Sequence, residues 1–361
     1  MRSNILFFLP SPLLLIIALL IFPSNKATAD GTIQYCLSCH ANANLSLTLS
    51  NKENLSLYLS PSMVESSVHF KQGIECIACH TDISSYPHPK LSISSKRELS
   101  RSYYLSCKKC HSINYEKTKD SIHEQIAEQG NPMAPICTDC HGAHDTKPVE
   151  APKTTISFTC KQCHGDIYNE YKDSIHGYAL IKTDNQDVPV CTDCHGVHNI
   201  DDPRTVKFHN ETPELCAGCH AQKELMSKYG LSSNVYDLYK ASWHGVEISV
   251  YKSQWPTIWH SSAICTDCHG VHNIRSAKDP KSSVNPKNLL TTCQKCHPGT
   301  NQNFVQVWTG HNPITLAKTP FLYYTNEFYN TFIPLLFWLM IIYIMLQIIH
   351  QFINRARSMK Q

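Results

Sequence analysis

The chain has 361 residues, 18 of them cysteine and 21 histidine, with a formal net charge of +3. So many cysteines could indicate a disulfide framework, but every one falls in a Cys-x-x-Cys pair that a histidine follows directly. Because the basic residues are scattered rather than clustered, the charge gives no reason to expect a nucleic-acid partner.

The N-terminus has the pattern of an export signal. Arg2 precedes an apolar run from Ile5 to Phe22, and Ala27-Thr28-Ala29 offers small residues for cleavage. These are the three regions of a secretory signal, so we expect residues 1–29 to be a cleaved signal peptide. The alternative is an uncleaved membrane helix, since the apolar run is long enough to remain as an anchor.

Nine Cys-x-x-Cys-His motifs follow, and this pattern is typical of c-type haem attachment. Two thiols on one turn can reach the two vinyl groups of a porphyrin, and the adjacent histidine becomes the proximal iron ligand. Paired cysteines could instead hold zinc or form redox-active disulfides, but neither alternative explains a histidine at the same position nine times. The predicted attachment residues are Cys36, Cys39, Cys76, Cys79, Cys107, Cys110, Cys137, Cys140, Cys160, Cys163, Cys191, Cys194, Cys216, Cys219, Cys265, Cys268, Cys293 and Cys296. The predicted proximal ligands are His40, His80, His111, His141, His164, His195, His220, His269 and His297.

The motifs recur in two-motif repeats. Residues 103–150, 156–205 and 212–280 share one template, in which Cys-x-x-Cys-His is followed by Ser-x-His, then by Cys-Thr-Asp-Cys-His-Gly and one further histidine. Residues 32–91 form a looser copy, and residues 293–311 form half a copy. Four and a half two-haem repeats therefore predict nine haems.

The template also supplies a second histidine for each iron. A histidine three residues after a proximal ligand cannot easily reach the far face of the same porphyrin, so we expect it to bind a neighbouring haem. The sequence does not indicate which histidine serves which haem, and His88 is the least regular candidate. The predicted distal ligands are His69, His123, His176, His244 and His311 at Ser/Thr-x-His positions, and His88, His144, His198 and His272 after the second motifs.

Three histidines remain outside the template. We expect His209 to be solvated or close to a haem propionate. His260, five residues before Cys265, is the alternative to His244 as a distal ligand. His350 lies at the end of the C-terminal apolar run, where we expect an interfacial polar residue; a contact with a membrane partner is the alternative.

The C-terminal run from about Phe328 to Ile349 is long enough to span a bilayer. We expect a transmembrane helix over 326–350 and a cytoplasmic tail over 351–361, because Arg355 and Arg357 follow the run and basic residues favour the cytoplasmic side. The haem domain, residues 30–319, is then expected in the periplasm, anchored to a bacterial inner membrane.

About 290 residues for nine haems leave about 32 residues for each one, too few for ordinary layers of helices and sheets. We therefore expect a mainly irregular, haem-packed fold with short α-helices, many of them at the motifs, plus the C-terminal transmembrane helix. No sustained strand alternation appears. The insertion at 221–243 is expected to carry the longest soluble helices.

The blocks at 176–177, 191–198, 244–245 and 265–272 carry a resemblance to multihaem c-type cytochromes with doubled Cys-x-x-Cys-His motifs, which extends over about 32–311. The haem count resembles nonahaem modules that occur with a membrane cytochrome b subunit in anaerobic respiratory bacteria. This resemblance implies quinone-linked electron exchange between the membrane and periplasmic cytochromes or reductases. Small membrane-anchored quinol dehydrogenases differ, since they have an N-terminal helix and four or five haems, so we do not expect this chain alone to oxidise quinol.

Irons with two histidine ligands have no open position for a substrate, and without methionine ligation they favour low potentials. The sequence therefore favours an electron-transfer subunit. The alternative is a multihaem enzyme acting on nitrogen or sulfur compounds with one open haem, for which the first repeat with its irregular His88 is the place to look. A conductive filament is a third alternative, against which the C-terminal anchor argues.

Overall fold

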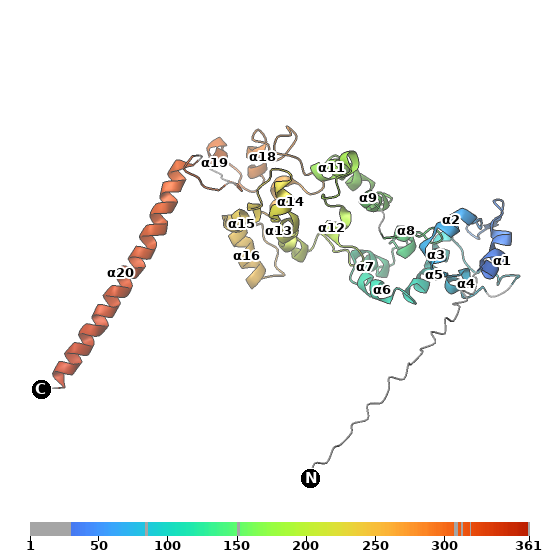
Figure 1. The fold of residues 1–361 in the computed structure, drawn as a ribbon, viewed down its shortest axis with the longest axis horizontal. Helices are drawn as coiled ribbons and strands as arrows, with labels where there is room; N and C mark the ends of the chain where they lie inside the picture. The colour runs from blue at the N-terminus through green and yellow to red at the C-terminus, as the bar shows by residue number, and fades with distance from the viewer. Residues whose placement is uncertain are drawn as a thin grey trace, which may run out of the picture. The chain divides into compact units, whose positions relative to one another are not determined.

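Short helices joined by irregular segments make up most of the chain in the computed structural model (Figure 1). The structure describes residues 30–83, 86–149, 152–306, 310–311, 313–317 and 319–359. The predicted signal peptide therefore lies outside the described residues. The mainly helical and irregular fold class is confirmed, and so is one long apolar helix at the C-terminal end.

The chain divides into two compact units. The first comprises residues 1–112 and 135–149, and the second comprises residues 113–134 and 150–361. The helices of the first unit are α1 (Asp30–His40), α2 (Pro61–Ser66), α3 (Val68–Lys71), α4 (Cys76–Cys79), α5 (Lys96–Lys108) and α8 (Cys137–His141). Apart from Ser112 at the start of α6, the remaining helices lie in the second unit. They are α6 (Ser112–Thr118), α7 (Ile122–Glu128), α9 (Lys153–Lys161), α10 (Gly165–Lys172), α11 (Ile175–Thr183), α12 (Cys191–His195), α13 (Val206–His220), α14 (Lys223–Ser227), α15 (Val235–Lys240), α16 (Trp243–Gln254), α17 (Cys265–His269), α18 (Leu289–Gln294), α19 (Gln302–Gln306) and α20 (Pro320–Ser358).

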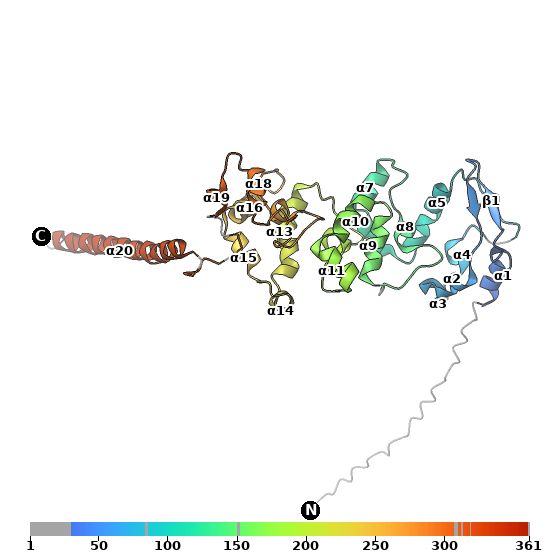
Figure 2. The same ribbon diagram turned by 90° about the horizontal axis from the view of Figure 1, so that it is seen from above.

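One small antiparallel hairpin lies between the first two motifs, where no strand was predicted (Figure 2). It pairs β1 (Ser46–Thr48) with β2 (Asn54–Ser56), and Leu47 lies opposite Leu55. Strands of three residues are too short for alternation to be visible in the sequence. The hairpin brings the chain back to α1, where the Leu59 N–H donates to the His40 carbonyl at 2.7 Å.

The prediction about the longest soluble helices is wrong. The insertion at 221–243 holds only α14 and α15, of five and six residues. Gly230 lies between them at φ 63°, a left-handed conformation that ends a helix. The longest helices outside the C-terminal one are α13, with 15 residues, and α5, with 13. A whole motif ends α13, and the first cysteine of another motif, Cys107, lies near the end of α5.

The polypeptide alone buries little apolar surface. Within the described residues twelve apolar side chains are buried, and Leu180 is the largest that is fully enclosed. Many large apolar side chains of the haem-motif region, such as Ile113 and Met133, are mostly exposed. A chain of this size ordinarily builds a continuous core, so the described fold lacks the interior that would hold its short helices together.

The C-terminal helix α20 has 39 residues and a mean hydropathy of 2.5 over its apolar window. At 1.5 Å per residue it is about 58 Å long, against about 30 Å for the hydrocarbon core of a bilayer. Its apolar side chains, from Phe328 to Ile349, are exposed along the whole length. This helix suggests that the chain is anchored in a membrane.

Candidate haem-binding sites

The second motif of three repeats forms a one-turn helix with the same local geometry each time. In α8, α12 and α17 the motif aspartate accepts the N–H of the residue before the first cysteine, at 2.7–2.8 Å. This contact satisfies a backbone donor at the start of each helix. Gly142, Gly196 and Gly270 then follow the motif histidine at φ 72°, 82° and 80°. Glycine adopts this conformation without strain, so the chain turns away directly after each predicted proximal ligand.

The predicted distal histidines of the Ser-x-His segments, His69, His123, His176 and His244, lie at the start of helices. In the third repeat, the Ser174 hydroxyl donates to the Tyr171 carbonyl at 2.7 Å and accepts the Gly177 N–H at 3.0 Å. Ser242, Tyr239 and Gly245 repeat this arrangement in the fourth repeat, at 2.6 and 3.3 Å. The serine thus caps the helix and fixes the start of the turn that carries the histidine.

Glycine after the distal histidine is required by a close backbone approach. A Cβ on Gly177 would lie 1.9 Å from the Tyr171 carbonyl oxygen, and a Cβ on Gly245 would lie 2.1 Å from that of Tyr239. The same tyrosines donate their hydroxyls to the Pro189 and Ala263 carbonyls, two residues before the next motif, at 2.8 and 3.0 Å. Both tyrosines recur in the template, but the spacing alone gave no reason to assign them a role.

Successive repeats are joined by one recurring hydrogen bond. The residue between the serine and the distal histidine donates its N–H to a carbonyl two residues beyond the final histidine of the next repeat. These bonds link Val68 to Thr146, Ile122 to Ile200 and Ile175 to Ile274, at 3.0, 2.9 and 2.7 Å. Each Ser-x-His turn is therefore positioned by the repeat that follows it.

Among the residues that the structure describes, predicted proximal and distal histidines lie together in the eight pairs given below. Their ring centroids are 6.0–6.3 Å apart, and each pair joins one histidine of a motif to one outside it. The pairs are His40–His88, His80–His144, His111–His69, His164–His123, His195–His272, His220–His176, His269–His311 and His297–His244.

This spacing fits an iron between two axial imidazoles. A metal–nitrogen bond of about 2 Å, with roughly 1.1 Å more from nitrogen to ring centre, separates two such rings by about 6.2 Å. Direct ring packing would bring centroids closer, as for His260 on Tyr251 at 4.3 Å. The gap within each pair therefore has the size of one metal ion with its two bonds.

Hydrogen bonding at His40 also fits iron ligation. Its Nδ1 donates to the Leu57 carbonyl at 2.7 Å, which leaves Nε2 with a lone pair. Ligand histidines commonly donate their other ring nitrogen in this way, and the bond fixes the ring orientation. Leu57 directly follows the small hairpin, so the unpredicted β-structure positions the first motif histidine.

The pairs also answer which distal histidine lies opposite which motif. His144 and His272 each face a motif of the preceding repeat, as the sequence argument expected for a histidine close behind its own motif. His69, His123 and His176 face the first motif of the following repeat. His141 and His198 occupy the same repeat positions as His80 and His144, and both remain predicted ligands.

Burial keeps many of the paired rings neutral, which is the form that binds a metal. It lowers the pKa of His176 to about 4, helped by the neighbouring His220. Burial is also the main cause that lowers the pKa of His80 and His144. Neutral rings in pairs are what two axial ligands of one iron require.

The attachment cysteines of consecutive motifs lie beside one another within each unit. Hydrogen bonding to Cys137 lowers the pKa of Cys107 to about 6, and hydrogen bonding to Cys160 lowers that of Cys191 to about 7. The same contact joins the first cysteines of the two motifs in the first and fourth repeats, Cys36 to Cys76 and Cys216 to Cys265.

Cysteines also meet between repeats. After burial, the main influences that raise the pKa of Cys79 are Cys107 and Cys110, and Cys194 likewise interacts with Cys216. The thiols of consecutive motifs therefore form two runs, over residues 36–137 in the first unit and 160–296 in the second. Attachment positions follow one another in sequence order within each run.

The histidines outside the template are placed as follows. His260 is buried and donates its Nε2–H to the Asn210 Oδ1 at 3.1 Å, while His244 faces His297. The geometry thus favours His244 over His260 as the ligand. His209 is half-buried, with its ring 4.5 Å from that of Trp259. His350 interacts with Asn354 on the same helix at 2.9 Å.

The two alternative uses of the cysteines fit the geometry less well. All eighteen cysteines are free of disulfide bonds. Structural zinc needs four protein ligands and catalytic zinc three, whereas each histidine pair offers two. In the described part of the chain, no group of three or more histidine, cysteine or acidic side chains is arranged around a common metal position. Two opposed rings beside a cysteine pair match a haem instead.

Comparison with known proteins gives the same class. The family model described as the doubled CXXCH motif matches residues 123–168 and 183–225. No curated protein and no solved structure matches the chain. The family match supports a multihaem c-type cytochrome with covalently bound haem, and hence a role in electron transfer.

The family match divides the chain one motif later than the template used above. Its two segments pair the motifs at Cys137 and Cys160, and those at Cys191 and Cys216. Within the second unit, the cysteines interact across the boundary of the family segments, from Cys160 to Cys191. They also interact across the boundary of the template repeats, from Cys194 to Cys216. Both divisions therefore describe the same repeated element and differ only in the motif at which the repeat is taken to begin.

Proposed function

We propose that this chain is a nonahaem c-type cytochrome, anchored to a bacterial inner membrane by α20 with its haem domain in the periplasm. It relays electrons between a quinone-linked, cytochrome b-type membrane partner and periplasmic cytochromes or reductases. Bound haem supplies reversible one-electron chemistry at its iron. The observation that carries the proposal is the set of eight opposed histidine pairs, each with room for one iron.

The pairs favour relay over catalysis. An iron held by two histidines has no free position for a small substrate. His88 was the least regular candidate, yet its ring lies 6.2 Å from that of His40 with an interplanar angle of 22°. The first repeat, where an open haem was most expected, therefore has two opposed histidines available at this motif, which supports the relay.

The role of the protein in this proposal is to set spacing and ligation. Consecutive cysteine pairs lie side by side within each unit, so the attached groups would be neighbours in sequence order. His311, on the last turn before the anchor, is nine residues from the start of α20 and faces His269. Nine residues reach at most about 32 Å, so the eighth motif stays close to the membrane end of the chain.

A membrane partner is proposed because one helix offers little surface for a quinone pocket. The apolar side chains of α20 are exposed along its length, which leaves them available for lipid and for helices of another subunit. Purification in mild detergent through a C-terminal tag should bring down a b-type cytochrome with the full chain. A variant that ends at Thr319 is the control, and recovery of the full chain alone would contradict this part of the proposal.

The relay itself is tested on the purified holoprotein. Intact mass should show nine haems, and electron paramagnetic resonance should show low-spin iron throughout, without carbon monoxide binding. A high-spin signal of about one equivalent, or tight binding of nitrite, cyanide or carbon monoxide, would favour the multihaem enzyme instead.

A further inference from the structure

The four Ser-x-His turns differ in how well they are covered. In the first three, the residue after the serine donates its N–H to a carbonyl of the next repeat, namely that of Thr146, Ile200 or Ile274. The serines of these turns, Ser67, Ser121 and Ser174, are buried to 2–3% exposure. The following repeat therefore acts as a cap on each of these turns.

The fourth turn has the same local geometry without such a cap. Ser242 makes the same hydrogen bonds as Ser174, but it is only half-buried. Trp243, in the position of Val68, Ile122 and Ile175, is 88% exposed, and its N–H has no acceptor among the described residues. The reason lies in the sequence, since only half a repeat follows and it contains no Cys-Thr-Asp-Cys-His-Gly segment.

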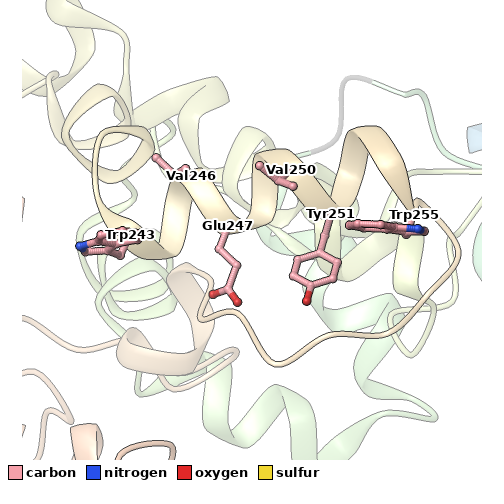
Figure 3. A pocket seen from close by; sticks show the side chains of 6 residues that line it. All are labelled: Trp243, Val246, Glu247, Val250, Tyr251 and Trp255. Carbon is pink, nitrogen blue, oxygen red and sulfur yellow. The ribbon is translucent and has the colours of Figure 1, made fainter.

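The helix after this turn is also longer than its counterparts. The helices α3, α7 and α11 have 4, 7 and 9 residues, whereas α16 has 12. Its additional turns carry Val250, Tyr251 and, directly after the helix, Trp255. With Trp243, Val246 and Glu247 they line a groove of about 430 Å³. Figure 3 shows the six side chains. We call these six residues the α16 groove.

The groove adjoins a predicted haem ligand. Glu247 interacts electrostatically with His244, which faces His297 of the last motif. Trp243 precedes His244 directly in the chain. A molecule bound in the α16 groove would therefore lie next to the terminal haem position of the second unit.

We propose that the α16 groove is the docking site for a second multihaem c-type cytochrome. The partner presents the segment that follows a Cys-x-x-Cys-His motif, and a backbone carbonyl of that segment accepts the Trp243 N–H. This inference rests on the proposed electron-relay function. It names the partner that exchanges electrons with the haem at the last motif.

The occupant is argued from the three internal copies of the same contact. In each copy the covering segment is the stretch after a motif, so the turn has a shape that this kind of segment fits. In a second copy of this chain, the three segments with a histidine three residues after the motif are already used, because the Thr146, Ile200 and Ile274 carbonyls accept internal bonds. The segment after the second motif of the first repeat differs, since it has Ile83 at that position. Uncovered ends of repeat proteins are prone to bind another repeat, because stacking is what stabilises each one.

The test places a photo-crosslinker at the turn in full-length holoprotein. Trp243→p-benzoylphenylalanine replaces one aromatic side chain by another, and illumination of native membranes is followed by peptide mass spectrometry. We expect a cross-linked peptide from a different polypeptide that contains Cys-x-x-Cys-His with a histidine three residues later. Adding Val246→Asp on the groove should lower its yield at least tenfold.

A matched control uses the covered turn of the third repeat. Ile175→p-benzoylphenylalanine should cross-link within the chain, to residues close to Ile274. If this control reacts while position 243 reacts with nothing, with lipid, with a second copy of the chain or with a protein that lacks the motif, the docking proposal is wrong. Low-spin haem spectra are recorded on the same samples, and their loss would instead count against the proposed relay function.

Discussion

At the scale of single residues, the proposed relay depends on the opposed histidine rings. His144 and His80 have centroids 6.0 Å apart and an interplanar angle of only 11°, and both are kept neutral by burial. His209, in contrast, packs on Trp259 and faces no motif histidine among the described pairs. His144 and His209 therefore provide a matched test of iron ligation.

We expect His144→Ala to convert one haem from low spin to high spin, because the iron at His80 would lose its second ligand. About one equivalent of carbon monoxide should then bind, and electron paramagnetic resonance should show the new signal. His209→Ala should leave both readouts unchanged. An unchanged spectrum in His144→Ala, or a high-spin signal in the control, would contradict the assignment.

Gly177 tests the local geometry that presents a distal histidine. A methyl group at this position would meet the Tyr171 carbonyl oxygen, so Gly177→Ala should destabilise the holoprotein by about 1–3 kcal/mol, as overpacking does. Gly165, at the start of α10 and outside the Cys-x-x-Cys-His motif, has nothing within 4 Å of its added Cβ. Gly165→Ala should instead be neutral or stabilising by up to about 1 kcal/mol, and thermal unfolding of both variants measures the difference.

Sequence spacing identified the candidate ligands because the covalent motif fixes them locally. It could not pair them, since the pairing depends on the path of the chain between distant residues. His195 and His272, for example, are 77 residues apart and meet only because the repeats are stacked by backbone hydrogen bonds. The supporting Leu57 carbonyl was also invisible, because any residue offers a carbonyl.

At the scale of elements, stacking depends on a backbone donor at the first position of a helix. Ile122 begins α7, where proline is normally tolerated because its N–H has no partner within the helix. Here that N–H donates to the Ile200 carbonyl at 2.9 Å. Ser121 before it is extended, with ψ 143°, which also suits a following proline.

Ile122→Pro should therefore cost about 1 kcal/mol for the lost hydrogen bond, beyond the loss of the side chain. Ile122→Ala is the comparison, because it shortens the side chain and keeps the N–H. Chemical unfolding of the two holoproteins measures the difference. Equal stability would show that the recurring bond between repeats contributes nothing.

The C-terminal element is tested by removal. A chain that ends at Thr319 lacks α20, and we expect it in the soluble periplasmic fraction with unchanged haem content, because the apolar helix provides the attachment. Cell fractionation and the haem spectrum measure both properties. The full chain with His350→Ala should remain in the membrane, and a truncated chain that stays there would contradict anchoring by α20.

At the scale of the whole molecule, the sequence predicted the absence of an ordinary core but not the arrangement of the chain. The prediction followed from simple proportion, because about 32 residues for each haem cannot enclose it in layers. Short helices at the motifs were predictable from the same proportion, because so few residues for each haem leave room for short helices only. The expectation for 221–243 was wrong because Gly230 divides the segment into two short helices.

The small core gives the last prediction. With twelve buried apolar side chains among the described residues, burial cannot offset the conformational entropy lost on ordering so long a chain. Protein produced without haem attachment should therefore lack a cooperative thermal transition and should be digested at least about tenfold faster than holoprotein. The helix α20 serves as an internal standard, since its stability in detergent depends on its own backbone hydrogen bonds rather than on haem. An apoprotein that unfolds cooperatively at the same temperature as the holoprotein would mean that the polypeptide, and not the haem, stabilises the fold.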